Sequence, residues 1–258
     1  MQLTEYIDRV FKRLLQNPLD HFTRLLPSQC AVCHAWPSEP VCNACMARFA
    51  TDKPRCKSCA IALPADLSMG RRGRVDLCMD CIKQPPPVDA TLAALDYAYP
   101  WSGLISRYKF GEHSGWASFF ASVLLKAPGS SQASQSADLI LPVPLSRERL
   151  QTRGFNQAWE LASALAKQSG RTAKTDTTLL LRVKDTQPQT ELLRQERLAN
   201  VKGAFQIDPL RTHEIKGKRV LLVDDVMTSG ASLFTAAQAL RVGGATHITG
   251  IVLARTPF

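Results

Sequence analysis

A strand that ends in two adjacent carboxylates and a small-residue turn limits how this chain can fold more than any other stretch. It lies in residues 218–232, KRVLLVDDVMTSGAS. The apolar run 219–223 predicts a strand covered on both faces. After the turn, apolar residues recur at helical spacing and predict a helix with one buried face: Leu233, Ala236, Ala237 and Leu240. The expected fold class is therefore α/β, with a central, mostly parallel sheet.

The turn between this strand and this helix has the chemistry of a phosphate site. Its hydroxyl and glycine residues are small, so they leave consecutive backbone N–H groups accessible, and the helix dipole favours an anion there. Asp224 and Asp225 would repel a phosphate, but they can accept hydrogen bonds from vicinal hydroxyls or approach a divalent cation. The predicted ligand is a sugar phosphate. An ordinary strand-to-helix turn with an Asp cap is the alternative.

The same stretch closely resembles the phosphoribosyl pyrophosphate (PRPP) motif of type I phosphoribosyltransferases, in which an acidic pair precedes a Thr/Ser-Gly-x-Thr/Ser loop. The resemblance implies that Asp224 and Asp225 are the catalytic acid pair, bind the ribose hydroxyls and act with Mg²⁺ and PRPP. It also implies that residues 227–232 hold the 5-phosphate. The full set of PRPP-binding residues implied in this way is Asp224, Asp225, Val226, Met227, Thr228, Ser229, Gly230, Ala231 and Ser232.

All eight cysteines belong to four Cys-x-x-Cys pairs that end at Cys81. A two-residue gap lets one tight turn present both sulfurs to a single ion, and two such turns complete a tetrahedral site. We therefore expect two structural zinc ions. The assignment that closes the shorter loops gives one ion Cys30, Cys33, Cys42 and Cys45, and the other ion Cys56, Cys59, Cys78 and Cys81.

Other uses of the cysteine pairs remain open. An interleaved arrangement of the pairs, iron held by thiolates and an iron–sulfur cluster fit the same residues. Cys30-Ala-Val-Cys33-His34 matches a covalent haem signature, but haem would leave the other pairs unexplained. Thioredoxin-like redox chemistry is disfavoured because no pair follows a strand in a βαβ context.

The charge balance favours an anionic partner. Lysine and arginine number 32 against 22 acidic residues, which gives a formal charge of +10. A sugar phosphate and a nucleic acid both fit this excess. No apolar run is long enough for a signal peptide or a membrane span, so the expected location is the cytoplasm, where cysteines stay reduced.

The expected domain organisation has three parts. Residues 1–26 have the pattern of a basic amphipathic helix, and residues 27–84 form a double zinc-ribbon domain. After the stiff spacer Pro85-Pro86-Pro87, residues 88–258 form the α/β domain.

Within the α/β domain, the apolar run at 138–144 is expected to be the first strand of the parallel core. The Ser/Gln-rich stretch 128–138 before it is expected to be a flexible loop. A polar segment within 179–205 is expected to form a mobile lid.

A second informative stretch, PLSRERLQTRGFNQ, follows the strand at 138–144. It carries Arg147, Arg149 and Arg153 beyond the carboxyl end of that strand, where ligands bind in open α/β sheets. Arg147 and Arg153 are the candidates for the pyrophosphate side of the site. A solvated basic face is the alternative.

Together, the cysteine pairs and the stretches PVPLSRERLQTRGFNQA, TQPQTELLRQERLANVKGAF and VLLVDDVMTSGAS resemble the ComF family of competence proteins. The resemblance implies a double zinc ribbon joined to a type I phosphoribosyltransferase-like domain. It implies a cytoplasmic role in natural transformation, or in the use of DNA as a nutrient. Single-stranded DNA and other competence proteins, including the DNA-uptake helicase and strand-loading factors, are the implied partners.

Three functions fit these features. The first is a ComF-like factor that binds PRPP or a related phosphate and acts with single-stranded DNA. The second is an active phosphoribosyltransferase, in which Mg²⁺ and the arginines stabilise departing pyrophosphate while a nucleobase attacks. The third is a zinc-ribbon module that binds nucleic acid without small-molecule chemistry, supported by basic residues beside the cysteine pairs: Lys53, Arg55, Lys57, Arg71, Arg72 and Arg74.

Overall fold

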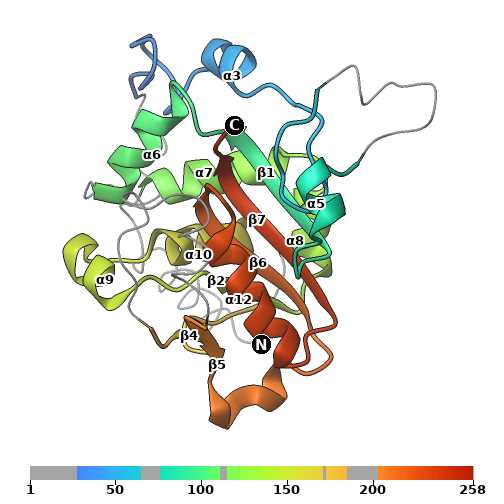
Figure 1. Cartoon of the computed structure of the whole chain (residues 1–258). Helices are drawn as coiled ribbons and strands as arrows, with labels where there is room; N and C mark the ends of the chain where they lie inside the picture. The colour runs from blue at the N-terminus through green and yellow to red at the C-terminus, as the bar shows by residue number, and fades with distance from the viewer. Residues whose placement is uncertain (1–27, 65–75, 111–114, 171–172, 185–202, 258) are drawn as a thin grey trace, which may run out of the picture. The chain divides into compact units, whose positions relative to one another are not determined.

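The computed structural model in Figure 1 describes residues 28–64, 76–110, 115–170, 173–184 and 203–257. The chain forms two compact units, Met1–Ala50 and Thr51–Phe258. The amphipathic helix expected at 1–26 lies outside the described residues, and so do residues 185–202 of the expected lid.

The first unit is built from tight cysteine turns and one short helix. An antiparallel bridge joins Ser28 to Ser38, and Cys42 caps helix α3, Asn43–Phe49. The buried apolar residues among its described part are Cys30, Val41 and Cys45. So small a core needs a source of stability besides hydrophobic burial.

A five-stranded sheet forms the centre of the second unit, and its paired strands run parallel. The order across the sheet is β1-β7-β6-β2-β3. The strands are β1, Ala90–Asp96; β2, Leu139–Pro142; β3, Lys174–Thr175; β6, Arg219–Met227; and β7, His247–Arg255. The long central strands β6 and β7 are buried along most of their length, as expected for strands covered on both faces. The α/β class is confirmed.

Helices pack on both faces of this sheet. The described α-helices of this unit are α5, Met79–Lys83; α6, Trp101–Phe110; α7, Gly115–Lys126; α8, Ser130–Ser136; α9, Arg147–Arg153; α10, Gln157–Gln168; and α12, Ala231–Val242. On one face α10 packs against α7, β2 and β6. On the other face α12 lies across β6 and β7 (Figure 1). In the described part of the chain, none of the helices has the length and apolar character needed to cross a membrane.

The second cysteine group is part of the hydrophobic core of this unit. Cys56, Cys59 and Cys81 belong to the same buried cluster as Leu222 of β6 and Leu233 of α12. The turn of the first pair is tied to the edge strand β1, because the backbone N–H of Thr91 donates to the carbonyl of Lys57 at 2.7 Å. Metal binding at this group would therefore act directly on the packing of the sheet.

Local capping signals place α9 and α10 at the carboxyl end of β2. The Ser146 hydroxyl accepts a hydrogen bond from the Arg149 N–H at 3.3 Å and begins α9. Gly154 ends that helix with a φ of 76°, a left-handed conformation that suits glycine. The Asn156 side chain then caps α10 by accepting from the Ala158 N–H at 3.0 Å. The arginine-rich stretch is therefore a helix just beyond the carboxyl end of β2.

A small antiparallel pair lies outside the main sheet. Strand β4, Leu180–Arg182, pairs with β5, Phe205–Ile207, and the 3-10 helix η2, Pro209–Glu214, follows. Arg211 of η2 forms ion pairs with Asp176 at 2.5 Å and with Glu214 at 2.6 Å. The described residues on either side of 185–202 contact each other, because the Val183 N–H donates to the Ala204 carbonyl at 2.9 Å.

Two expectations about individual elements are wrong. The strand at 138–144 is not the first of the parallel core, because β1 already pairs in parallel with β7. Residues 128–138, expected to be a loop, contain α8. Ser130 and Ser134 lie one turn apart and are both buried, so small side chains allow this polar helix to pack closely.

Candidate functional site

The acidic pair lies inside strand β6 rather than in the turn after it. Strand β6 continues to Met227 because its neighbour β7 pairs with it as far as Arg255. Asp225 is buried at 7% exposure, and Asp224 is partly buried. The backbone N–H of Asp225 donates to the Asp224 carboxylate at 2.9 Å. This bond fixes the Asp224 carboxylate near the carboxyl end of β6.

Lys109 of α6 contacts this pair, although its sequence position alone gives it no role. Its Nζ lies 3.1 Å from Asp225 Oδ1, and both side chains are mostly buried. The run Arg107-Tyr108-Lys109 is visible in the sequence, but only the fold brings it to β6. The ion pair adds a cationic group to the acidic site.

Gln157, the first residue of α10, connects Lys109 to Arg153. Its side-chain nitrogen donates to the Lys109 carbonyl at 3.3 Å, and its side-chain oxygen accepts from Arg153 Nη1 at 2.9 Å. Its own carbonyl accepts from the Tyr108 hydroxyl at 2.8 Å. Gln157 is 1% exposed, so these bonds hold the two cationic residues at a fixed spacing.

The predicted pyrophosphate-side arginines occupy different environments. Burial lowers the pKa of Arg153, while the charges of Asp225 and Asp224 act in the opposite direction. The Arg153 guanidinium also lies over the Phe110 ring, 5.2 Å from its centroid. Arg147 is exposed at the start of α9. Arg153 and, through its charge on Asp224, Arg149 are thus the arginines of this stretch that interact electrostatically with the acidic pair.

Asp224 has an unusual ionisation for a carboxyl group. Burial, together with the charge of Asp225, raises its pKa to about 7, although the charges of Lys109 and Arg149 partly oppose this. A carboxyl group with such a pKa holds a proton part of the time at neutral pH and releases it when a cation approaches. The site is therefore prepared to bind additional positive charge.

The loop that follows, called here the phosphate loop (residues 227–232), leads directly into α12. Gly230 is the N-cap of α12, with a φ of 82°. The first N–H groups of a helix have no partner within it and can bind an anion, and here the Ala231 N–H donates to the Ser229 hydroxyl at 3.4 Å. Thr228, Ser229 and Ser232 are partly exposed beside them. The loop therefore places small polar side chains beside the start of α12.

Substituting Gly230 with alanine is expected to destabilise the protein by about 2–3 kcal/mol, because the backbone strain of a positive φ adds to the steric overlap of the new Cβ with its neighbours. A Cβ at Gly230 would lie 2.5 Å from Met227 Cε and 2.5 Å from Phe234 Cε2. Gly217→Ala is the matched control, since its φ is 76° but nothing lies within 4 Å of the added atom. Thermal unfolding should show only about 1 kcal/mol lost in the control. Equal losses in the two variants would contradict the close packing of the loop.

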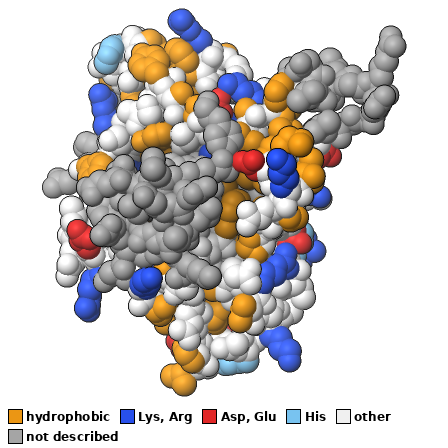
Figure 2. Space-filling model, viewed as in Figure 1, with side chains coloured by type: hydrophobic (Ala, Val, Ile, Leu, Met, Phe, Trp, Pro, Cys, Tyr) orange, Lys and Arg blue, Asp and Glu red, His pale blue; other side chains and the backbone are white. Residues whose placement is uncertain are grey.

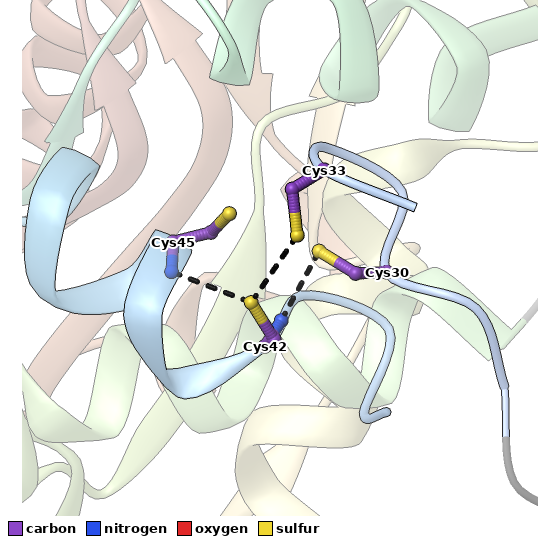
Figure 3. A group of neighbouring side chains, drawn as sticks. All are labelled: Cys30, Cys33, Cys42 and Cys45. Atoms are coloured by element: carbon purple, nitrogen blue, oxygen red, sulfur yellow. Dashed lines mark hydrogen bonds between the residues drawn. The ribbon is translucent and has the colours of Figure 1, made fainter. Parts of the chain in front are cut away.

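Each cysteine group brings four sulfurs together in chain order, as the shorter loops predict. All four Sγ atoms lie within 4.8 Å of one another in the group Cys30, Cys33, Cys42 and Cys45 (Figure 3), and likewise in the group Cys56, Cys59, Cys78 and Cys81. The Sγ atoms of Cys33 and Cys42 are 3.6 Å apart, as are those of Cys59 and Cys78. Zinc bound by four thiolates at about 2.3 Å requires sulfurs roughly 3.8 Å apart. Both groups can hold structural zinc.

The ionisation of the second group also favours a bound cation. A hydrogen bond from Cys59, supported by the Cys78 N–H, lowers the pKa of Cys56 to about 4. Burial raises the pKa of Cys81 to about 12. One thiolate thus suppresses ionisation of its neighbours, and four thiolates require the charge of a metal ion.

Part of the basic cluster predicted to bind nucleic acid is engaged within the fold. Lys53 and Arg55 both pair with Asp96, and Arg55 Nη2 lies 2.8 Å from Asp96 Oδ1. Lys57 is exposed, whereas Arg71, Arg72 and Arg74 lie outside the described residues. On the face drawn in Figure 2, the described lysines and arginines stand at separate places instead of forming one continuous patch.

Comparisons with known proteins identify related chains. A family model for the phosphoribosyl transferase domain matches residues 150–257, which include Arg153, the acidic pair and the phosphate loop. The chain is 32% identical over 219 residues to DNA utilization protein YhgH of Escherichia coli strain K12. The aligned residues cover 84% of this chain and 90% of that protein. It is 33% identical over 181 residues to competence protein F of Haemophilus influenzae, an alignment that covers 69% of this chain and 78% of that protein. It is 32% identical over 119 residues to competence protein ComFC of Bacillus subtilis, an alignment that covers 46% of this chain and 45% of that protein.

Proposed function

The chain belongs to the ComF family of competence proteins, and from that premise we propose that it binds PRPP or a related phosphoribosyl ligand together with Mg²⁺. In this proposal it acts with single-stranded DNA in the cytoplasm, in natural transformation or in DNA utilisation. The observation that carries the proposal is the convergence of the acidic pair, Lys109, Arg153 and the phosphate loop at one edge of the sheet. The names of the relatives support the DNA context.

Each part of the site has a role in this proposal. Asp224 and Asp225 accept hydrogen bonds from the ribose hydroxyls, and the phosphate loop binds the 5-phosphate through backbone N–H groups. Arg153 and Lys109 face the pyrophosphate, with Gln157 fixing their spacing. Bound Mg²⁺ would supply charge that neutralises the pyrophosphate oxygens.

An active phosphoribosyltransferase is the second candidate, and the same residues support it. In that reaction the bond between C1 of the ribose and pyrophosphate breaks as a nucleobase nitrogen attacks C1. Arg153 and Lys109 would stabilise the negative charge on the departing pyrophosphate. A site for the nucleobase has no support among the described residues, so binding without turnover is the primary proposal.

Calorimetry of the zinc-loaded protein with PRPP and Mg²⁺ tests the proposal. Binding is expected, with proton release near pH 7 because the pKa of Asp224 is raised to about 7. Titrations in two buffers of different ionisation enthalpy detect that proton. Pyrophosphate release assayed in the same samples with each common nucleobase then separates the two candidates. No binding of PRPP at millimolar concentration would reject both.

Association with single-stranded DNA and with other competence proteins is the less specific part of the proposal. The excess positive charge supports modest, salt-sensitive affinity, with the logarithm of the binding constant falling by roughly 0.7 per neutralised phosphate for each tenfold rise in salt. Fluorescence titration of a labelled oligonucleotide at several salt concentrations measures that slope. Absence of binding at low salt would remove direct DNA contact from the proposal.

A further inference from the structure

One buried arginine joins the second cysteine group to the phosphate loop. Arg255, the last residue of β7, is 3% exposed. Its Nε donates to the carbonyl of Cys59 at 2.9 Å. Its Nη1 donates to the carbonyl of Met227 at 3.2 Å and to the carbonyl of Thr256 at 2.9 Å. A single guanidinium therefore connects a predicted metal ligand with the first residue of the phosphate loop.

The chemistry of this contact suits a rigid connection. A buried charge is costly unless its donors are satisfied, and arginine presents five donors in a planar fork that can bridge several acceptors. The Met227 carbonyl also accepts from the Thr256 N–H at 3.0 Å, so the last residue of β7 and the residue after it both fix that carbonyl. Movement of the Cys59 carbonyl would thus be transmitted to Met227 through Arg255.

The position of the Cys59 carbonyl depends on the shape of the cysteine turn. Ala60, directly after Cys59, has a φ of 54°, which is uncommon for a residue with a side chain. Its N–H donates to the Cys56 carbonyl at 2.8 Å, and its carbonyl accepts from Arg55 at 3.2 Å. Metal binding at the flanking sulfurs would hold this strained turn closed.

We propose that Arg255 is a positioning residue that couples metal binding at Cys56, Cys59, Cys78 and Cys81 to the conformation of the phosphate loop. Loss of that metal loosens the loop and weakens binding of the phosphate group. The effect on ligand affinity rests on the proposed function, whereas the effect on loop conformation does not. The first cysteine group belongs to the other compact unit and provides a matched comparison.

Hydrogen–deuterium exchange of the full-length protein without ligand tests the coupling. Cys81→Ser breaks the second group while leaving Arg255 and Cys59 in place, and Cys45→Ser breaks the first group in the same way. Elemental analysis should find one zinc per chain in each variant. Amides of the phosphate loop are expected to exchange at least about tenfold faster in Cys81→Ser and at the wild-type rate in Cys45→Ser. Equal loop exchange in the two variants would overturn the proposal.

Arg255→Lys provides a second test that leaves the cysteines unchanged. The lysine keeps the charge but cannot span the same three carbonyls, so two zinc ions should remain bound while loop exchange rises. Loop exchange at the wild-type rate in Arg255→Lys would also overturn the proposal. Affinity for PRPP with Mg²⁺ is then compared among the variants. If the wild type binds no PRPP, the proposed function fails, and the exchange measurements still decide the coupling.

Discussion

PRPP affinity is expected to fall by at least about 100-fold in the double variant Asp224→Ala, Asp225→Ala. The two carboxylates are proposed to bind the ribose hydroxyls and to add negative charge beside Mg²⁺, and a hydrogen bond to a charged group contributes about 1.5–3 kcal/mol. Losing both also leaves Lys109 without the carboxylate that lies 3.1 Å from its Nζ. Calorimetry against the wild-type protein measures the loss.

The fold of this double variant should survive. The raised pKa of Asp224 means that the folded chain holds its proton more tightly than the unfolded chain does. Stability therefore decreases as the pH rises between its ordinary value of 3.8 and about 7, and removing the carboxylate relieves that decrease. Losing the Asp225 pair with Lys109 acts in the opposite direction. Asp208→Ala, at the start of η2, removes an acidic residue outside the site and serves as the control for affinity. Wild-type affinity in the double variant would reject the assignment of the acidic pair.

Removal of zinc is expected to unfold the part of the first unit within residues 28–50 and to destabilise the second unit without unfolding it. Structural zinc contributes roughly 10–16 kcal/mol of binding free energy, which is comparable to the whole stability of a domain. The first unit has Val41 as the one buried apolar residue besides cysteine in its described part. The second unit keeps the core formed by β6, β7 and α12.

A chelator titration followed by limited proteolysis measures this difference between the units. Cleavage should appear first within residues 28–50, and the melting temperature of the remaining fold should fall. Readdition of zinc should restore protection, whereas Mg²⁺ should not, because it prefers oxygen ligands. Protection that persists after complete loss of both metal ions would contradict a structural role for the cysteine groups.

The features predicted from the sequence are those whose signals are local. The two sulfurs of each cysteine pair are set by one turn, and grouping of neighbouring pairs follows from short loops. The strand, acidic pair and loop of residues 218–232 are likewise continuous in the chain. The loop predicted at 128–138 from its serine and glutamine content was wrong, because the segment contains α8. Burial of Ser130 and Ser134 against neighbouring elements decides that helix, and local propensity does not report such burial.

The features that the sequence could not provide depend on pairings between distant segments. Lys109 meets Asp225 only because α6 packs beside the carboxyl end of β6. Nothing in the sequence distinguishes Gln157 from other residues that begin a helix, and its role is visible only in its hydrogen bonds with Lys109 and Arg153. Arg255 carries no signal of its own in the sequence, and its contact with Cys59 spans nearly the whole second unit in sequence. Such residues require the strand order of the sheet to be known.

Because β1 pairs with β7, which lies near the end of the chain, the sheet can close only late in synthesis of the protein. Asp89, just before β1, accepts a hydrogen bond from the N–H of Ile248, 159 positions later in the sequence. At typical elongation rates of 5–20 residues per second, β1 waits roughly 10–30 s for its partner strand to be made. Both cysteine groups can leave the ribosome and acquire metal in that interval. The metal-loaded turn would then already cover the outer edge of β1, so that only the edge facing β7 stays unpaired until translation is complete.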